Sequence, residues 1–130
     1  MTTDRPILLA VDDEPDILDF LERVFRKQYT VLRANDASQA LSELESAAVQ
    51  VLVTDQRMPG QSGLELLERV AADHPETTRL LLSGFSDLPE ITAAAESGLV
   101  HAYVVKPVDS MRLREAVTEA EARHREGDWT

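Results

Sequence analysis

The sequence predicts an α/β domain in which a five-stranded parallel sheet carries helices on both faces. Short apolar runs alternate five times with longer stretches whose apolar residues recur at helical spacing. Three runs, over residues 7–11, 49–53 and 80–82, are almost continuously apolar, which is typical of parallel strands covered on both sides. At 130 residues the chain has the length of one domain and is too short for an eight-unit barrel. Right-handed crossovers then leave a doubly wound sheet as the expected arrangement.

The five strands are expected where the short apolar runs lie. Each run has the length of a strand and is followed by a turn or by a helix start. We place the strands near Pro6–Val11, Thr30–Ala34, Val49–Thr54, Arg79–Ser83 and His101–Val105.

The first three helices have clear starts or clear faces. Apolar residues between Ile17 and Phe25 fall on one side of a helix and charged residues on the other. The second helix is expected to begin after an Asp36 cap. The third begins at Ser62, where Glu65 three residues later completes a capping box.

The last two helices are marked by turn and cap residues. The fourth is expected to begin around Ser86 or Asp87, with Pro89 in its first turn, and to end at Gly98. The fifth follows Asp109. The helical pattern is lost after about residue 125, so we expect one domain over residues 1–125 and a tail or the start of a linker over 126–130.

Composition narrows the classes of function. A formal net charge of −11 argues against direct binding of nucleic acid, which depends on Lys and Arg neutralising phosphates. The absence of cysteine excludes disulfides and thiolate metal sites, so a metal here would be a hard ion on oxygen or histidine ligands. The apolar runs are too short for a membrane span and the first residues lack the basic start of a signal peptide. We expect a cytoplasmic protein without membrane contact.

Charged and polar side chains follow four of the five strands. Asp12 and Asp13 follow the first strand, Asp55 the third, Ser83 the fourth and Lys106 the fifth. In open parallel sheets these carboxyl ends meet at the edge where ligands bind. Three carboxylates close together repel one another unless a cation lies between them, and Mg2+ takes oxygen ligands while keeping waters that a phosphate can replace. The set fits phosphoryl transfer, which depends on positioning and charge neutralisation.

Four motifs occur in order at these strand ends. They are Val11-Asp12-Asp13-Glu14, residues 54–60 with Gly63 following, Leu82-Ser83-Gly84 and residues 103–107, Tyr-Val-Val-Lys-Pro. With them the chain, from Pro6 to about Arg123, resembles the receiver domain of bacterial response regulators. The resemblance implies a flavodoxin-like fold with strand order 2-1-3-4-5, which is the order of the chemotaxis member of that family. It also implies a cis peptide between Lys106 and Pro107.

The resemblance assigns a role to each acidic residue. Asp55 would take a phosphoryl group from a phosphohistidine on a sensor histidine kinase or a phosphotransfer protein. Asp13, Asp55 and the backbone carbonyl of Arg57 would bind Mg2+, with Mn2+ as an alternative ion, and Asp12 would act through water. The domain would be no enzyme beyond its own phosphorylation and dephosphorylation.

The remaining roles concern the response to phosphorylation. Lys106 would neutralise the phosphoryl oxygens, Ser83 would move toward the phosphate and Tyr103 would turn inward behind it. These switch residues would alter the face made by the fourth helix, fifth strand and fifth helix, through which the domain would signal to an output domain or effector protein, or form a homodimer. Arg57 and Phe85 border the site and would tune how quickly water reaches the acyl phosphate.

Two departures and two rival functions stand beside this interpretation. Gln56 is polar where the family prefers an apolar residue, and Ser83 takes a place more often held by threonine. One rival is a pseudo-receiver, an interaction module that is never phosphorylated. The other is a haloacid-dehalogenase-like phosphatase, which also uses an Asp nucleophile after a strand but places a second Asp where this chain has Arg57. The histidines His74, His101 and His124 lack ligand spacing, so we expect surface or packing roles for them.

Overall fold

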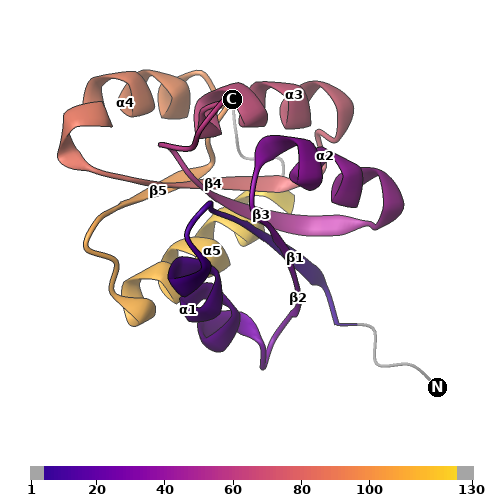
Figure 1. Cartoon of the computed structure of the whole chain (residues 1–130). Helices are drawn as coiled ribbons and strands as arrows, with labels where there is room; N and C mark the ends of the chain where they lie inside the picture. Colours follow the sequence, from indigo (N-terminus) through magenta and orange to yellow (C-terminus); the bar gives the residue numbers. More distant parts are fainter. Residues whose placement is uncertain (1–4, 126–130) are drawn as a thin grey trace.

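Strands and helices alternate along residues 5–125, the part of the chain that this computed structural model describes (Figure 1). The tail expected over residues 126–130 lies outside that range. The elements are β1 (Ile7–Val11), α1 (Pro15–Phe25), β2 (Thr30–Ala34), α2 (Ala37–Ser46), β3 (Val49–Asp55), α3 (Gly63–Asp73), β4 (Thr78–Ser83), the 3-10 turn η1 (Phe85–Asp87), α4 (Leu88–Glu96), β5 (Ala102–Val105) and α5 (Ser110–Arg125).

The strands form one parallel sheet in the order β2-β1-β3-β4-β5, which confirms the predicted fold class and strand order. Helices α1 and α5 cover one face of this sheet, and α2, α3 and α4 cover the other (Figure 1). The order reverses at β1, because β2 lies on one side of it and β3 on the other. The carboxyl ends of β1 and β3 therefore lie side by side at the edge where ligands bind in such sheets.

Alternate residues of the central strands enter two different cores. On β1, Leu8 and Ala10 pack with α1 and α5, whereas Leu9 and Val11 pack with α2, α3 and α4. All four are completely buried. Burial of a side chain the size of leucine contributes roughly 1.5–3 kcal/mol, so the near-continuous apolar runs are required by both faces.

The strand boundaries agree with the sequence prediction to within one residue: β3 extends to include Asp55, and β5 begins after His101. The fourth helix differs more, because α4 ends at Glu96, two residues before the predicted end at Gly98, which has a positive φ of 86°. The capping interactions of α2 and α3 are present, since Asp36 accepts a hydrogen bond from Gln39 N and Ser62 and Glu65 form the capping box. No helix within residues 5–125 is long and apolar enough to cross a membrane.

A histidine pair lies at the opposite edge of the sheet from the carboxyl ends of the strands. The ring centroids of His101 and His124 are 4.0 Å apart, and His101 is buried. His101 Nδ1 accepts a hydrogen bond from Arg79 N at 2.8 Å, and His124 Nδ1 lies 2.8 Å from the Thr78 hydroxyl. Burial lowers the pKa of His101 to about 3, helped by the charges of Arg79 and His124. These contacts give the two histidines a packing role.

Candidate functional site

Three carboxylates meet where β1 and β3 end. Asp12 and Asp13 follow β1 directly, and Asp55 is the last residue of β3. One oxygen from each of the three side chains lies within 4.8 Å of the other two. Asp12 and Asp55 are buried and Asp13 is exposed, so the cluster opens to solvent on one side.

Asp12 is the most perturbed member of this cluster. Its Oδ1 accepts a hydrogen bond from Glu14 N at 2.9 Å, but its buried Oδ2 has no hydrogen-bond partner among residues 5–125. Burial raises the pKa of the Asp12 carboxyl to about 6, and the charges of Asp55 and Asp13 act in the same direction, against the Glu14 bond and Lys106. A buried oxygen without a partner, beside two other carboxylates, is the donor set that a hard divalent cation satisfies.

Lys106 supplies the opposing charge. Its Nζ lies 2.5 Å from Asp55 Oδ1, and its backbone N–H donates to Ser83 O at 2.7 Å. The Lys106–Pro107 peptide is cis, as the resemblance implied. The Lys106 side chain is about two-fifths exposed whereas that of Asp55 is buried, so the ion pair joins a buried carboxylate to a partly exposed lysine.

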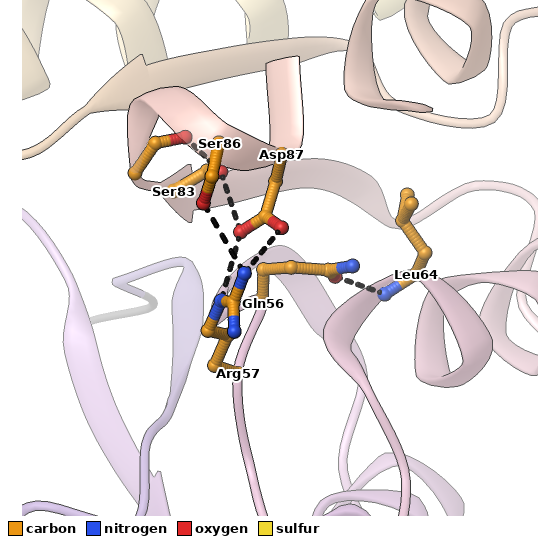
Figure 2. Close-up of polar contacts among 7 residues, drawn as sticks. Gln56, Arg57, Leu64, Ser83, Ser86 and Asp87 are labelled. Atoms are coloured by element: carbon orange, nitrogen blue, oxygen red, sulfur yellow. Dashed lines mark hydrogen bonds and ion pairs between the residues drawn. The ribbon is translucent and has the colours of Figure 1, made fainter. Parts of the chain in front are cut away.

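Ser83 lies at the end of β4 and is buried. Its hydroxyl donates to the adjacent carbonyl of Gly84 at 3.0 Å and contacts Asp87 Oδ2 at 3.5 Å (Figure 2). In this structure the Ser83 hydroxyl therefore contacts residues that precede α4. Its predicted movement toward Asp55 stays a prediction.

Arg57 reaches the same acidic side chain from the loop after β3. Its Nε and Nη2 donate to the two carboxylate oxygens of Asp87 at 3.3 and 3.1 Å, and Nη2 also donates to the Ser86 hydroxyl at 3.2 Å (Figure 2). In the sequence, Asp87 is predicted only as a possible start of the fourth helix. An aspartate at a helix start signals a cap, and nothing local reveals that its carboxylate pairs with a residue 30 positions away.

Gln56, the polar departure from the family pattern, fastens the start of α3. Its side-chain oxygen accepts a hydrogen bond from Leu64 N and its backbone oxygen one from Gly63 N, both at 2.9 Å. Gly63 packs so closely that an added β-carbon would lie 2.4 Å from the carbonyl oxygen of Asp55. Gln56 and Gly63 thus hold α3 directly against the backbone of the proposed phosphoacceptor.

The two remaining predicted residues are Tyr103 and Phe85. Tyr103 on β5 is half-buried and packs against the core beneath α2, α3 and α4. Phe85 lies in η1, and its side chain is outside the described part of the structure. The structure thus brings together Asp12, Asp13, Asp55 and Lys106, and it places Ser83 at the next strand end.

Comparison with known proteins decides the family. The profile of the response regulator receiver domain matches residues 8–118. The chain belongs to the response regulator receiver domain family. Receiver domains are signalling modules of two-component systems, and the family generally uses Mg2+ at an acidic pocket. Membership decides between a receiver and a haloacid-dehalogenase-like phosphatase in favour of the receiver.

Individual relatives agree with this family. The hydrogenase transcriptional regulatory protein HoxA of Cupriavidus necator is 34% identical over 129 residues, which are 98% of this chain and 27% of HoxA. The response regulator protein PilR of Pseudomonas aeruginosa is 34% identical over 117 residues, 89% of this chain and 26% of PilR. This receiver therefore spans about a quarter of the length of the curated relatives it matches.

Solved structures share the fold along nearly the whole chain. The signal receiver domain of an HD domain-containing protein from Pseudomonas fluorescens Pf-5 superposes with a TM-score of 0.86 at 34% identity, covering 98% of this receiver and 95% of that chain. A response regulator receiver domain protein from Clostridium thermocellum superposes with a TM-score of 0.85 at 27% identity, covering 92% and 97%.

Proposed function

We propose that this receiver accepts a phosphoryl group on Asp55 in a Mg2+-dependent reaction and passes the signal to an output domain or effector protein. The observation that carries the proposal is the direct contact between Lys106 Nζ and Asp55 Oδ1 beside the buried, unsatisfied Oδ2 of Asp12. Asp55 thus lies between the positive charge of Lys106 and the Asp12 carboxylate, one oxygen of which has no hydrogen-bond partner among residues 5–125. A pseudo-receiver would have no use for this arrangement.

The metal-binding residues proposed are Asp13, Asp55 and the backbone carbonyl of Arg57, with Asp12 acting through a water molecule. The carboxylate oxygens already lie within 4.8 Å of one another. Burial raises the pKa of Asp12, and the charges of Asp55 and Asp13, which a cation would offset, raise it further. Bound Mg2+, or Mn2+ in its place, would neutralise charge on the transferring phosphoryl group. The site chemistry, with oxygen donors only, suits these hard ions.

The transfer itself needs a nucleophile, a charge partner and a leaving group. A carboxylate oxygen of Asp55 forms a bond to phosphorus as the bond from phosphorus to the donor histidine nitrogen breaks, and that nitrogen keeps the electron pair. Lys106 then holds a phosphoryl oxygen by a charge-assisted hydrogen bond. The donor is a sensor histidine kinase or a phosphotransfer protein, and the reaction takes place in the cytoplasm.

The signal would leave through the face made by α4, β5 and α5. Ser83, at the end of β4, and Tyr103, on β5, would be its switch residues, because one side chain contacts the start of α4 and the other is half-buried on the sheet. Met111 on α5 is exposed on 62% of its surface, which suits a surface that binds a partner or forms a homodimer. Arg57 and Phe85 would tune the access of water to the acyl phosphate.

Intact-mass spectrometry after incubation with acetyl phosphate and Mg2+ tests the proposal. We expect one phosphoryl adduct in the wild-type chain and none in Asp55→Asn or when a chelator removes the metal. Asp36→Asn is the matched control, because it makes the same substitution at an exposed helix cap. An adduct that persists in Asp55→Asn contradicts the site, and the absence of any adduct in the wild type supports the pseudo-receiver.

A further inference from the structure

Asp87 stands at the position where α4 should be capped, yet its side chain makes no capping hydrogen bond to that helix. Its backbone is not extended there, with φ −97° and ψ 1°. By contrast, Asp36 and Ser62 are extended and accept hydrogen bonds from the third residue of their helices. A capping aspartate typically contributes about 1 kcal/mol to helix stability. Because Asp87 makes no capping hydrogen bond, its carboxylate is available for another interaction.

The carboxylate of Asp87 is directed to the phosphorylation site instead. It accepts hydrogen bonds from Arg57, two residues after Asp55, and its Oδ2 also lies 3.5 Å from the Ser83 hydroxyl (Figure 2). Asp87 is buried, and a buried carboxylate requires such partners. One side chain thereby joins the loop after β3 to the end of β4.

The Ser83 hydroxyl has a single hydrogen to donate. In this structure the hydroxyl donates to Gly84 O at 3.0 Å and lies 3.5 Å from a second acceptor, Asp87 Oδ2. It cannot at the same time serve a phosphoryl oxygen on Asp55. Formation of a bond from Ser83 to the phosphoryl group therefore requires that Ser83 leave Asp87.

We propose that Asp87 is a latch that holds the unphosphorylated arrangement of this receiver. Together with Arg57 it retains the Ser83 hydroxyl at the start of α4, in competition with the phosphoryl group on Asp55. When the phosphoryl group takes Ser83, Asp87 loses one partner and gains a neighbouring negative charge that repels it. This inference rests on the proposed phosphorylation of Asp55.

Release of the latch would change α4 itself. A free Asp87 carboxylate can cap α4 if its backbone becomes extended, as the backbones of Asp36 and Ser62 already are. A surface hollow of about 510 Å³, lined in part by Arg57 and Asp87, gives both side chains room to move. The start of α4 would then differ between the two states, which connects the site to the face through which the signal leaves.

The substitution Asp87→Ser separates the latch from the cap. Serine removes the carboxylate that pairs with Arg57 but remains a good capping residue. With Mg2+ present, we expect the concentration of beryllium fluoride that half-saturates Asp55 to fall about two- to tenfold, as expected for losing one competing hydrogen bond. Amide NMR signals of Ser83 and of α4 report the binding. Without beryllium fluoride, they should already be displaced toward the positions of the bound wild-type protein.

Asp36→Ser is the matched control, because it removes the same charge from the residue that caps α2. Within residues 5–125, Asp36 makes no hydrogen bond with Arg57. The half-saturating concentration for Asp36→Ser should equal that of the wild type. An Asp87→Ser protein that behaves like Asp36→Ser overturns the latch, while binding by the wild type still supports the proposed function. A wild-type protein that binds no beryllium fluoride overturns both.

Arg57→Met provides an independent variant that leaves the residue at the start of α4 unchanged. We expect a change in the same direction as for Asp87→Ser, because the carboxylate loses the partner that positions it. In the double variant the two effects should not add, since both remove one interaction. Additive effects would contradict the latch. A weaker affinity for beryllium fluoride in Arg57→Met alone would contradict it even if Asp87→Ser did not fold.

Discussion

Lys106 Nζ lies 2.5 Å from Oδ1 of Asp55, although Asp55 ends β3 and Lys106 follows β5, two strands that are separated in the sheet by β4. This pair sets the first prediction. Lys106→Met should slow adduct formation with acetyl phosphate about 10- to 100-fold, the effect of losing one hydrogen bond to a charged group. Intact-mass time courses would measure it.

The chain contains one other lysine, Lys27, which is exposed in the turn after α1. Lys27→Met removes the same charge far from the site and should leave the rate unchanged. Equal rates for the two variants would mean that Lys106 acts only through net charge.

Gly63→Ala should destabilise the fold at the site. Its β-carbon would lie 2.4 Å from Asp55 O and 2.8 Å from a methyl carbon of Leu81, so α3 must move away from β3. Overpacking of this kind typically costs about 1–3 kcal/mol. The free energy of unfolding in urea measures it. Gly84→Ala, where an added β-carbon meets nothing within 4 Å, should change stability by less than about 0.5 kcal/mol.

Asp12→Asn should stabilise the metal-free protein at neutral and higher pH. Burial raises the pKa of Asp12 from its usual 3.8 to about 6, so the folded state binds that proton more tightly than the unfolded state does. The resulting stability is fully present below pH 3.8 and is lost as the pH rises through about 6. The loss amounts to at most about 3 kcal/mol.

Urea unfolding in chelator from pH 4 to pH 8 would measure this effect as the difference between Asp12→Asn and the wild type. The variant should gain relative stability as the pH rises. Added Mg2+ should stabilise the wild type more than the variant. A difference that does not change with pH would show that Asp12 is not perturbed by its surroundings.

His101→Asn should reduce the acid sensitivity of the fold. Burial lowers the pKa of His101 from its usual 6.5 to about 3, so the unfolded state binds the extra proton between these values. The stability that neutral His101 contributes is present above pH 6.5 and is lost as the pH falls toward 3. Between pH 8 and pH 5 the loss is about 2 kcal/mol.

Asparagine retains an oxygen that can accept the hydrogen bond from Arg79 N but has no ring to titrate. Urea unfolding at pH 8 and pH 5 would therefore show a smaller decrease for His101→Asn than for the wild type. His74→Asn, a half-buried histidine for comparison, should behave like the wild type. Equal pH dependence for all three proteins would contradict a buried neutral His101.

The strands, the helix starts and the acidic residues at the strand ends could be predicted from the sequence because their signals are local. Apolar runs and helical spacing depend on neighbouring positions, and Ser62 and Glu65 cap a helix that begins beside them. Asp12, Asp55 and Lys106 could be grouped because parallel strands bring their carboxyl ends to one edge. The strand order itself came from the family resemblance.

The partners of polar side chains were decided only by the tertiary structure. In the sequence Asp87 is predicted to be a helix cap, but its carboxylate pairs with Arg57. Gln56 departs from the family's preference for an apolar residue, and its side chain accepts a hydrogen bond from the first turn of α3. Tyr29 and Glu121, 92 residues apart, share a buried 2.6 Å hydrogen bond that no local pattern marks. The sequence by itself determined which elements form and which chemistry gathers at one edge of the sheet. The choice of partner for each buried polar group depended on which elements pack together, because such a group bonds to whatever donor or acceptor the fold brings within reach.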